Sequence, residues 1–128
     1  MFMLDTNACI DFLDGRSSLL EARVDKHFGH LTVSMISVAE LMVGSKTSSN
    51  PRRDAERLDA FIAGVDLAEF NLATARRYGE VIKQIGVRRK SYDRLIGVQA
   101  LALGLTLVTR NGKDFADVPG LVVENWTV

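Results

Sequence analysis

The sequence lacks several features that would place it in a specialised class of protein. Its 128 residues include a single cysteine, Cys9, so the chain can form neither an internal disulfide nor a zinc site built on cysteines. No apolar run approaches the ~20 residues of a membrane-spanning helix, and no basic segment followed by a long apolar one marks a signal peptide. We therefore expect a cytoplasmic protein without membrane contact, with Cys9 buried and unreactive among apolar neighbours.

An excess of charge of either sign is also missing. Sixteen Lys and Arg residues balance sixteen Asp and Glu residues, so the net charge does not indicate nucleic-acid binding, although the distribution of charge matters more than its sum. The two histidines, His27 and His30, match no zinc-binding spacing. No glycine-rich phosphate loop of either common pattern is present, which argues against nucleotide binding through such a loop.

Short apolar runs alternate along the chain with segments of helical periodicity, and neither a linker nor a repeat interrupts them. We expect strands at residues 1–4, 31–34, 65–70, 105–109 and 121–126. We expect helices at residues 8–13, 18–28, 37–43, 54–63, 71–85 and 92–103. In this interpretation Asn7 caps the first helix, while Gly44 and Gly104 end the third and the last. The alternation predicts one α/β domain over residues 1–128, a three-layer α/β/α fold with a central parallel sheet of four to five strands.

Four acidic residues stand near the points where this sheet would place its ligand crevice, which lies outside the carboxyl ends of parallel strands. Asp5 directly follows the first strand, Glu40 comes shortly after the second, and Asp114 follows the fourth. Asp93 begins the helix before that strand, and the segment 86–92 must bring it to the same edge. Seven residues can span at most about 25 Å, which makes this path possible.

Four carboxylates in one crevice would repel one another, and such a cluster either raises pKa values or binds a cation. Oxygen ligands without a nearby histidine or cysteine favour Mg²⁺ or Mn²⁺ over zinc. Such an ion can polarise a phosphoryl oxygen and activate a water, and two ions about 4 Å apart can act on both reacting oxygens. The pattern therefore favours metal-assisted hydrolysis of a phosphodiester.

Each acid alone also has a structural interpretation. Asp5 could cap the end of a strand, and Ser37 with Glu40 fits a helix capping box. Asp93 could complement the dipole of its helix, and Asp114 could belong to a turn. Only the placement of all four acids near the same edge of the predicted sheet favours a metal site.

Other charged residues are expected to surround this site. Asp11 and Asp14 are predicted to be solvated, and Asp117 stands close enough to Asp114 to replace it. A basic rim suited to an RNA backbone is predicted from Lys83, Arg88, Arg89, Lys90, Arg94, Arg110 and Lys113. A solvated helix end is the alternative interpretation of these residues.

Four stretches together resemble the PIN-domain toxins of the VapC type. They are MLDTNACIDFL, SVAELMVG, YDRLIGVQALALGLTLVTRN and DFADVPGLVVENW, which follow one another with sensible spacing over nearly the whole chain. The resemblance implies a PIN-like fold and a Mg²⁺- or Mn²⁺-dependent ribonuclease that acts on structured cellular RNA such as tRNA. It also implies a cognate antitoxin that lays a peptide into a groove by the active site, and a homodimer.

The resemblance extends to single positions. The family's four acidic positions correspond to Asp5, Glu40, Asp93 and Asp114, and its supporting polar positions to Thr6, Asn7, Thr109 and Asn111. Tyr92 and Gly97 depart from the more usual residues, and a glycine within a helix should cost up to about 1 kcal/mol relative to alanine.

Two other functions remain open at this point. One is a catalytically silent PIN-like module that binds RNA or protein. The other is an aspartyl-phosphate phosphatase with Asp5 as nucleophile, for which Asn7 stands where a second acid is expected. A phospho-acceptor signalling domain would likewise need an acidic pair near the first strand.

Overall fold

A five-stranded parallel sheet forms the centre of the computed structural model, which describes residues 1–87 and 92–128. Its strands are β1 (Phe2–Leu4), β2 (Leu31–Ser34), β3 (Asp66–Ala68), β4 (Thr106–Val108) and β5 (Val123–Glu124), arranged in the order β3-β2-β1-β4-β5. The sequence prediction of a parallel α/β sheet is therefore confirmed, and β1 occupies its centre. Of the predicted basic residues, Arg88, Arg89 and Lys90 lie outside the described part of the chain.

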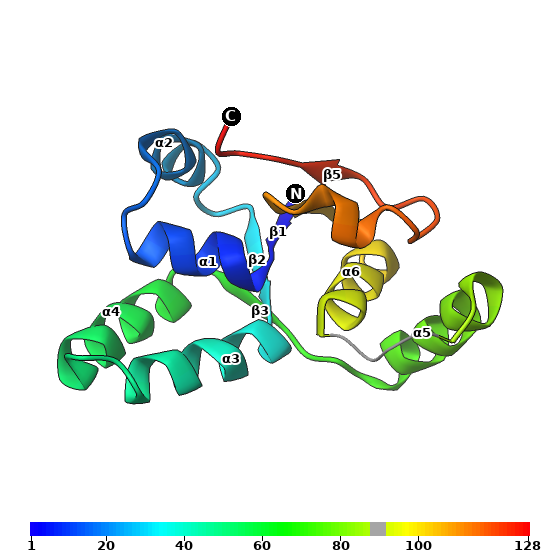
Figure 1. The fold of residues 1–128 in the computed structure, drawn as a ribbon, viewed down its shortest axis with the longest axis horizontal. Coiled ribbons are helices and arrows are strands. Elements are labelled where there is room, and N and C mark those ends of the chain that lie inside the picture. The colour runs from blue at the N-terminus through cyan, green and yellow to red at the C-terminus, as the bar shows by residue number, and fades with distance from the viewer. Residues whose placement is uncertain (88–91) are drawn as a thin grey trace.

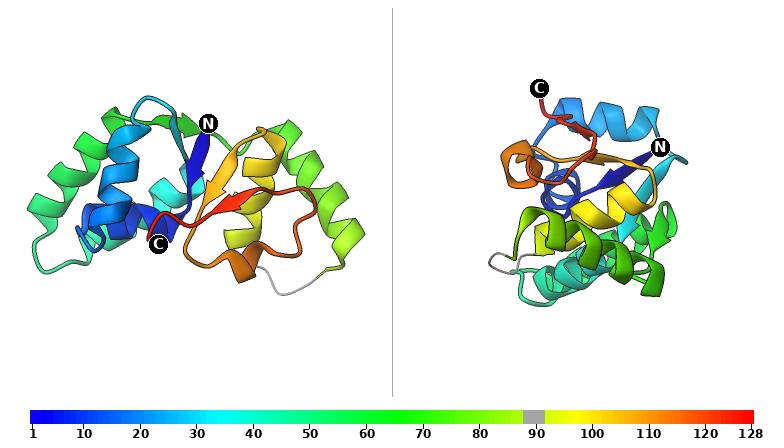
Figure 2. Two further views of the ribbon diagram at one scale, coloured as in Figure 1. Left: turned by 90° about the horizontal axis from the view of Figure 1, so that it is seen from above. Right: turned by 90° about the vertical axis from the view of Figure 1, so that its right-hand side faces the viewer.

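Helices lie on both sides of this sheet (Figures 1 and 2). They are α1 (Thr6–Leu13), α2 (Ser18–Lys26), α3 (Met35–Lys46), α4 (Pro51–Ala63), α5 (Leu72–Ile85) and α6 (Tyr92–Ala102), with a 3₁₀ helix, η1 (Gly112–Phe115). In Figure 1, α1, α2 and α4 lie on one side of the strands, and α5 and α6 on the other. No helix in the described ranges is long and apolar enough to cross a bilayer.

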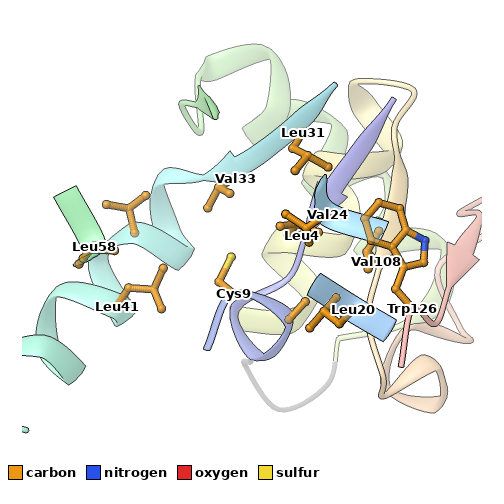
Figure 3. Packing of buried hydrophobic residues seen from close by; sticks show 12 residues of the cluster. Leu4, Cys9, Leu20, Val24, Leu31, Val33, Leu41, Leu58, Val108 and Trp126 are labelled. Carbon is orange, nitrogen blue, oxygen red and sulfur yellow. The ribbon is translucent and has the colours of Figure 1, made fainter. Parts of the chain in front are cut away.

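Successive residues of the central strands point to opposite faces, because side chains alternate along a β-strand. Leu4 and its register partner Val108 belong to the core cluster that includes Leu20 of α2 (Figure 3). Met3 and its register partner Leu107 belong to the cluster on the other face, which includes residues of α6. Burial on both faces explains why these strands are apolar throughout.

All six predicted helices are found, with bounds that differ by one to three residues, and two of them have caps other than those predicted. The first helix begins at Thr6, and its cap is Asp5, whose carboxylate accepts a hydrogen bond of 2.7 Å from the Ala8 N–H. Asn7 lies inside the helix, so its predicted capping role is wrong. The third helix begins after Ser34, which accepts from the Ile36 N–H, and it continues past Gly44 to Lys46. A glycine costs a helix only about 1 kcal/mol, which neighbouring packing can offset.

Candidate functional site

Asp5 lies where β1 ends and α1 begins. Its backbone N–H donates to the Val108 carbonyl oxygen at 3.1 Å, which extends the pairing of β1 with β4 by one residue. Its side chain is only 2% exposed and caps α1, so one carboxylate oxygen is committed to the helix. Strand, helix and capping bond together give this carboxylate a defined position at the carboxyl end of the sheet.

Thr109, directly after β4, supports the same carboxylate. A hydrogen bond from its side chain favours the ionised form of Asp5 and so lowers the pKa of that group. The Thr109 hydroxyl oxygen in turn accepts from the Asn111 N–H at 3.0 Å. Thr109 is 1% exposed, so this short chain of hydrogen bonds lies inside the protein and holds the segment after β4 against Asp5.

Glu40 is held from α1 by Thr6. The Thr6 hydroxyl oxygen lies 2.8 Å from a Glu40 carboxylate oxygen and 2.9 Å from the Ser37 hydroxyl oxygen. Because a carboxylate only accepts and a hydroxyl has one proton, Thr6 donates to Glu40 and accepts from Ser37. The alternative interpretation of Ser37 and Glu40 as a capping box does not hold, because Ser34 caps α3 and Glu40 is turned toward α1.

Asp93 and Asp114 approach from the other side of the sheet. Asp93 lies half-buried in the first turn of α6, and Asp114 is exposed in η1. Burial and the nearby Asp114 carboxylate raise the pKa of Asp93. Burial, followed by the carboxylates of Asp93 and Asp11, raises the pKa of Asp5, against the lowering effect of its hydrogen bonds. The structure thus brings these acids within electrostatic reach of one another.

The chemistry of this donor set fits a hard divalent cation. All candidate donors are carboxylate oxygens, and burial together with neighbouring carboxylates opposes the ionisation of Asp5 and Asp93 and raises the pKa of each, an effect that a bound cation would offset. Within residues 1–87 and 92–128, however, no group of three or more His, Cys, Asp or Glu side chains is already arranged around a common point. The roles of Asp5, Glu40, Asp93 and Asp114 as metal ligands stay predictions.

Several charged residues lie elsewhere than predicted. Asp11 is buried rather than solvated, at 3% exposure. Its carboxylate pairs with Arg16 at 3.4 Å and with the Nε of Arg110 at 3.3 Å. Arg110 is therefore tied back to α1, although 44% of its side chain stays exposed. Asp14 is exposed, as predicted.

Arg94 is not part of a solvated basic rim, because it is buried and forms an ion pair with Asp117. Asp117 is thus committed to Arg94 and does not act as a substitute for Asp114. Sequence reasoning missed this pair, although an arginine inside an otherwise apolar helical segment was a visible sign of a buried partner. Lys83 and Lys113 are exposed, and Lys113 neighbours Asp114.

A groove lies beside Glu40, between α1, α3 and α4. It encloses a cavity of about 260 Å³. Its walls combine apolar side chains with charged ones, among them Ile10, Leu13, Glu40, Leu41, Arg57 and Leu58. Glu40 lines this groove and accepts a hydrogen bond from Thr6, the residue after Asp5, so a molecule in the groove would contact one candidate site residue.

Comparison with known proteins gives consistent matches over the full length. Residues 2–121 match the PIN domain family. The chain is 28% identical over 129 residues to the tRNA(fMet)-specific endonuclease VapC of Shigella flexneri, covering 98% of each chain. It is 32% identical over 133 residues to Ribonuclease VapC2 of Rickettsia felis, again covering 98% of each.

Solved structures of similar proteins also match the chain over nearly its full length. The DNA-bound VapBC from Salmonella typhimurium contains a chain with a TM-score of 0.88 and 28% identity, with 98% of this chain and 97% of that chain covered. VapBC2 from Rickettsia felis, bound to a DNA fragment from its promoter, gives a TM-score of 0.86 and 29% identity, with 98% of each chain covered.

Proposed function

The chain belongs to the PIN-domain family, and on that premise we propose that it is a Mg²⁺- or Mn²⁺-dependent endoribonuclease, the toxin of a toxin–antitoxin pair. The observation that carries this proposal is the approach of Asp5, Asp93 and Asp114 at one edge of the sheet, where burial and mutual repulsion raise the pKa of the first two. Such a site is stabilised by a divalent cation, and a cation held by carboxylates suits phosphodiester hydrolysis.

Each residue has a defined part in this proposal. Asp5, Asp93 and Asp114 would hold the ion, directly or through water, and Glu40 would hold it or orient the attacking water. When bound, the ion would polarise a phosphoryl oxygen and make a water easier to deprotonate. Thr6 keeps Glu40 in one orientation through a 2.8 Å hydrogen bond.

The polar residues after β4 complete the arrangement. Thr109 favours the ionised form of Asp5 through its hydrogen bond, and the backbone of Asn111 holds Thr109 in place. Asn7 lies half-buried in the first turn of α1, two residues after Asp5. Asn7 occupies the position where an aspartyl-phosphate phosphatase needs its second acid. Its presence therefore argues against the phosphatase function.

RNA is the substrate class that we propose, because the relatives with matching length carry the names ribonuclease and tRNA-specific endonuclease. The exposed Lys113 beside Asp114, and the exposed part of Arg110, offer positive charge to a phosphate backbone near the acids. Structured RNA, tRNA included, is the substrate to test first.

A cognate antitoxin is the protein partner that we propose. The similar solved structures are VapBC toxin–antitoxin complexes, and the groove lined by Glu40 offers space beside that candidate site residue. A homodimer is also part of the proposal. Its support is that α3 leaves Met35, Met42 and Val43 exposed, which is apolar surface that a second copy could cover.

Cleavage of RNA by the purified, partner-free chain tests the proposed function. Total cellular RNA and tRNA are incubated with protein in Mg²⁺, in Mn²⁺ and in EDTA, alongside Asp5→Asn and a control, Asp25→Asn, on the exposed part of α2. Asparagine also caps helices well, so Asp5→Asn should fold. We expect discrete products that need metal, vanish with Asp5→Asn and persist with Asp25→Asn. Cleavage in EDTA would contradict the metal mechanism, and a folded, metal-loaded protein that cuts nothing would favour a silent binding module.

A further inference from the structure

We propose that two contacts between α6 and the segment 114–117 act as positioning devices for the metal site, by setting the distance between Asp93 and Asp114. The contacts are the Arg94–Asp117 ion pair and the packing of Gly97 on Phe115. We call these four residues the α6–η1 clamp. The inference rests on the proposed function, because it concerns how the carboxylates of that site are held.

The ion pair joins residues that lie close in the sequence to the two acids. Arg94 follows Asp93 in the first turn of α6 and is 8% exposed. Its guanidinium donates to the Asp117 carboxylate, which stands three residues after Asp114. The contact joins one guanidinium nitrogen to one carboxylate oxygen and is partly buried, so this charge-assisted hydrogen bond restricts the distance between α6 and residue 117. A shift of η1 relative to α6 would break it.

The second contact is apolar and independent of charge. Gly97 lies one helical turn after Asp93, and Phe115 follows Asp114 directly. A Cβ atom at position 97 would lie 2.8 Å from Cδ1 and 3.3 Å from Cε1 of Phe115, which is too close for ordinary packing. Phe115 is 2% exposed, so its ring cannot simply turn into solvent. The unusual glycine therefore allows η1 to approach α6 more closely than a larger residue would permit.

Together the two contacts resist a force that the site itself creates. Asp93 and Asp114 carry like charges and come from different segments, separated in the chain by β4. Without a cation their repulsion drives these segments apart. The two contacts close to these acids in the sequence keep the carboxylates close before an ion arrives, and a preorganised site loses less free energy on binding.

Mn²⁺ affinity of the metal-free protein, measured by titration calorimetry, tests the clamp without relying on activity. Asp117→Asn and Arg94→Gln each remove the ion pair, and Arg94→Lys keeps the charge. Val24→Ala, on the buried face of α2, serves as a control for general loss of stability. We expect at least tenfold weaker Mn²⁺ binding for Asp117→Asn and Arg94→Gln, partial recovery for Arg94→Lys, and wild-type affinity for Val24→Ala. The double variant Arg94→Gln/Asp117→Asn should bind no worse than the weaker single variant.

Cleavage as a function of Mn²⁺ concentration separates positioning from damage to the fold. For a positioning role, the Asp117→Asn variant needs more Mn²⁺ but approaches the wild-type maximal rate. Because the Asp117 side chain is 29% exposed, this variant should fold even where Arg94→Gln does not, and circular dichroism checks both. Wild-type Mn²⁺ affinity in a folded Asp117→Asn variant would overturn the clamp alone. A wild-type chain that binds no Mn²⁺ would overturn the proposed function and the clamp together.

Discussion

The Thr6 hydroxyl donates a 2.8 Å hydrogen bond to the carboxylate of Glu40, and this bond links the first turn of α1 to α3. It is one of two hydrogen bonds by which the first turn of α1 orients candidate site residues. The other is the cap of α1 itself, where the Ala8 N–H fixes one oxygen of Asp5. Two candidate ligands are thus oriented by the start of a single helix.

Replacing Thr6 with valine removes the hydroxyl at nearly constant shape. We expect a loss of about 1 kcal/mol in the free energy of unfolding, the usual net value of one hydrogen bond. We expect a fall of about tenfold in RNA cleavage, because freeing a residue at a metal site commonly costs that much. Urea denaturation and single-turnover cleavage measure the two effects. Thr6→Ser keeps the hydroxyl and should stay close to wild type; a Thr6→Val variant with full activity would contradict the role of this bond.

The stability of the metal-free protein should fall as the pH rises above about 4. Burial and neighbouring carboxylates raise the pKa of Asp5 and Asp93 above the ordinary value of 3.8. The folded protein then holds these protons more tightly than the unfolded chain. This contribution to stability is complete below the unfolded pKa and is lost as the pH rises through the folded one.

Urea denaturation in EDTA between about pH 4 and pH 7 measures this dependence. Asp5→Asn should make the free energy of unfolding depend less on pH and should raise it near neutral pH. The reason is that asparagine removes a buried charge but still caps α1. Saturating Mg²⁺ should reverse the slope for the wild type, since the ion binds the ionised carboxylates. An Asp5→Asn variant with an unchanged pH dependence would show that Asp5 is not the group responsible.

Two glycines within helices should respond in opposite ways to alanine. Gly97→Ala should destabilise the fold by about 1–3 kcal/mol, because its methyl group would lie 2.8 Å from Phe115. Gly79→Ala in α5 meets no atom within 4 Å and should gain about 0.5–1 kcal/mol from better helix propensity. Thermal and urea denaturation of both variants give the comparison. A Gly97→Ala variant as stable as Gly79→Ala would contradict the tight contact of α6 with η1.

Cys9 should be inert in the folded protein. It is 0% exposed, and burial raises the pKa of its thiol, so little thiolate exists to react. An aromatic disulfide reagent such as DTNB should label it quickly in denaturant and only very slowly without it. The labelling rate then reports how often the core around α1 opens. Rapid labelling of the native protein would mean that this part of the core opens far more easily than its packing indicates.

The predicted elements that the structure confirms are those with a local cause. The runs at β1 and β4 are apolar because both faces of the sheet are covered, and that pattern is visible in the sequence. Helix α5 begins after Asn71, whose side chain accepts from the Thr74 N–H at 2.9 Å, as a local capping residue should. The acid that follows the first apolar run was also placed correctly at the end of a strand, since Asp5 directly follows β1.

Asn7 as a cap and Gly44 as a helix end were wrong for local reasons, but other errors concern residues whose partners are distant in the chain. Asp11 was expected in solvent, but Arg110, which is 99 positions away, helps to bury it. Glu40 looked like part of a capping box with Ser37, but Thr6, which precedes it by 34 positions, orients it. Local propensity could not distinguish these outcomes, because the free energy that decides them comes from contacts formed only after folding.

Gly97 shows most clearly the difference between what local sequence determines and what tertiary contacts determine. By itself, the sequence determined the alternation of strands and helices and the acids at their ends, because periodicity and residue chemistry are local properties. Helix propensity alone counted Gly97 as a cost of up to about 1 kcal/mol. Only the tertiary structure shows why it is there, since the space that a Cβ atom would need is occupied by Phe115. The distances among the acids were likewise decided by how α1, α3, α6 and η1 pack on the sheet, which no local pattern specifies.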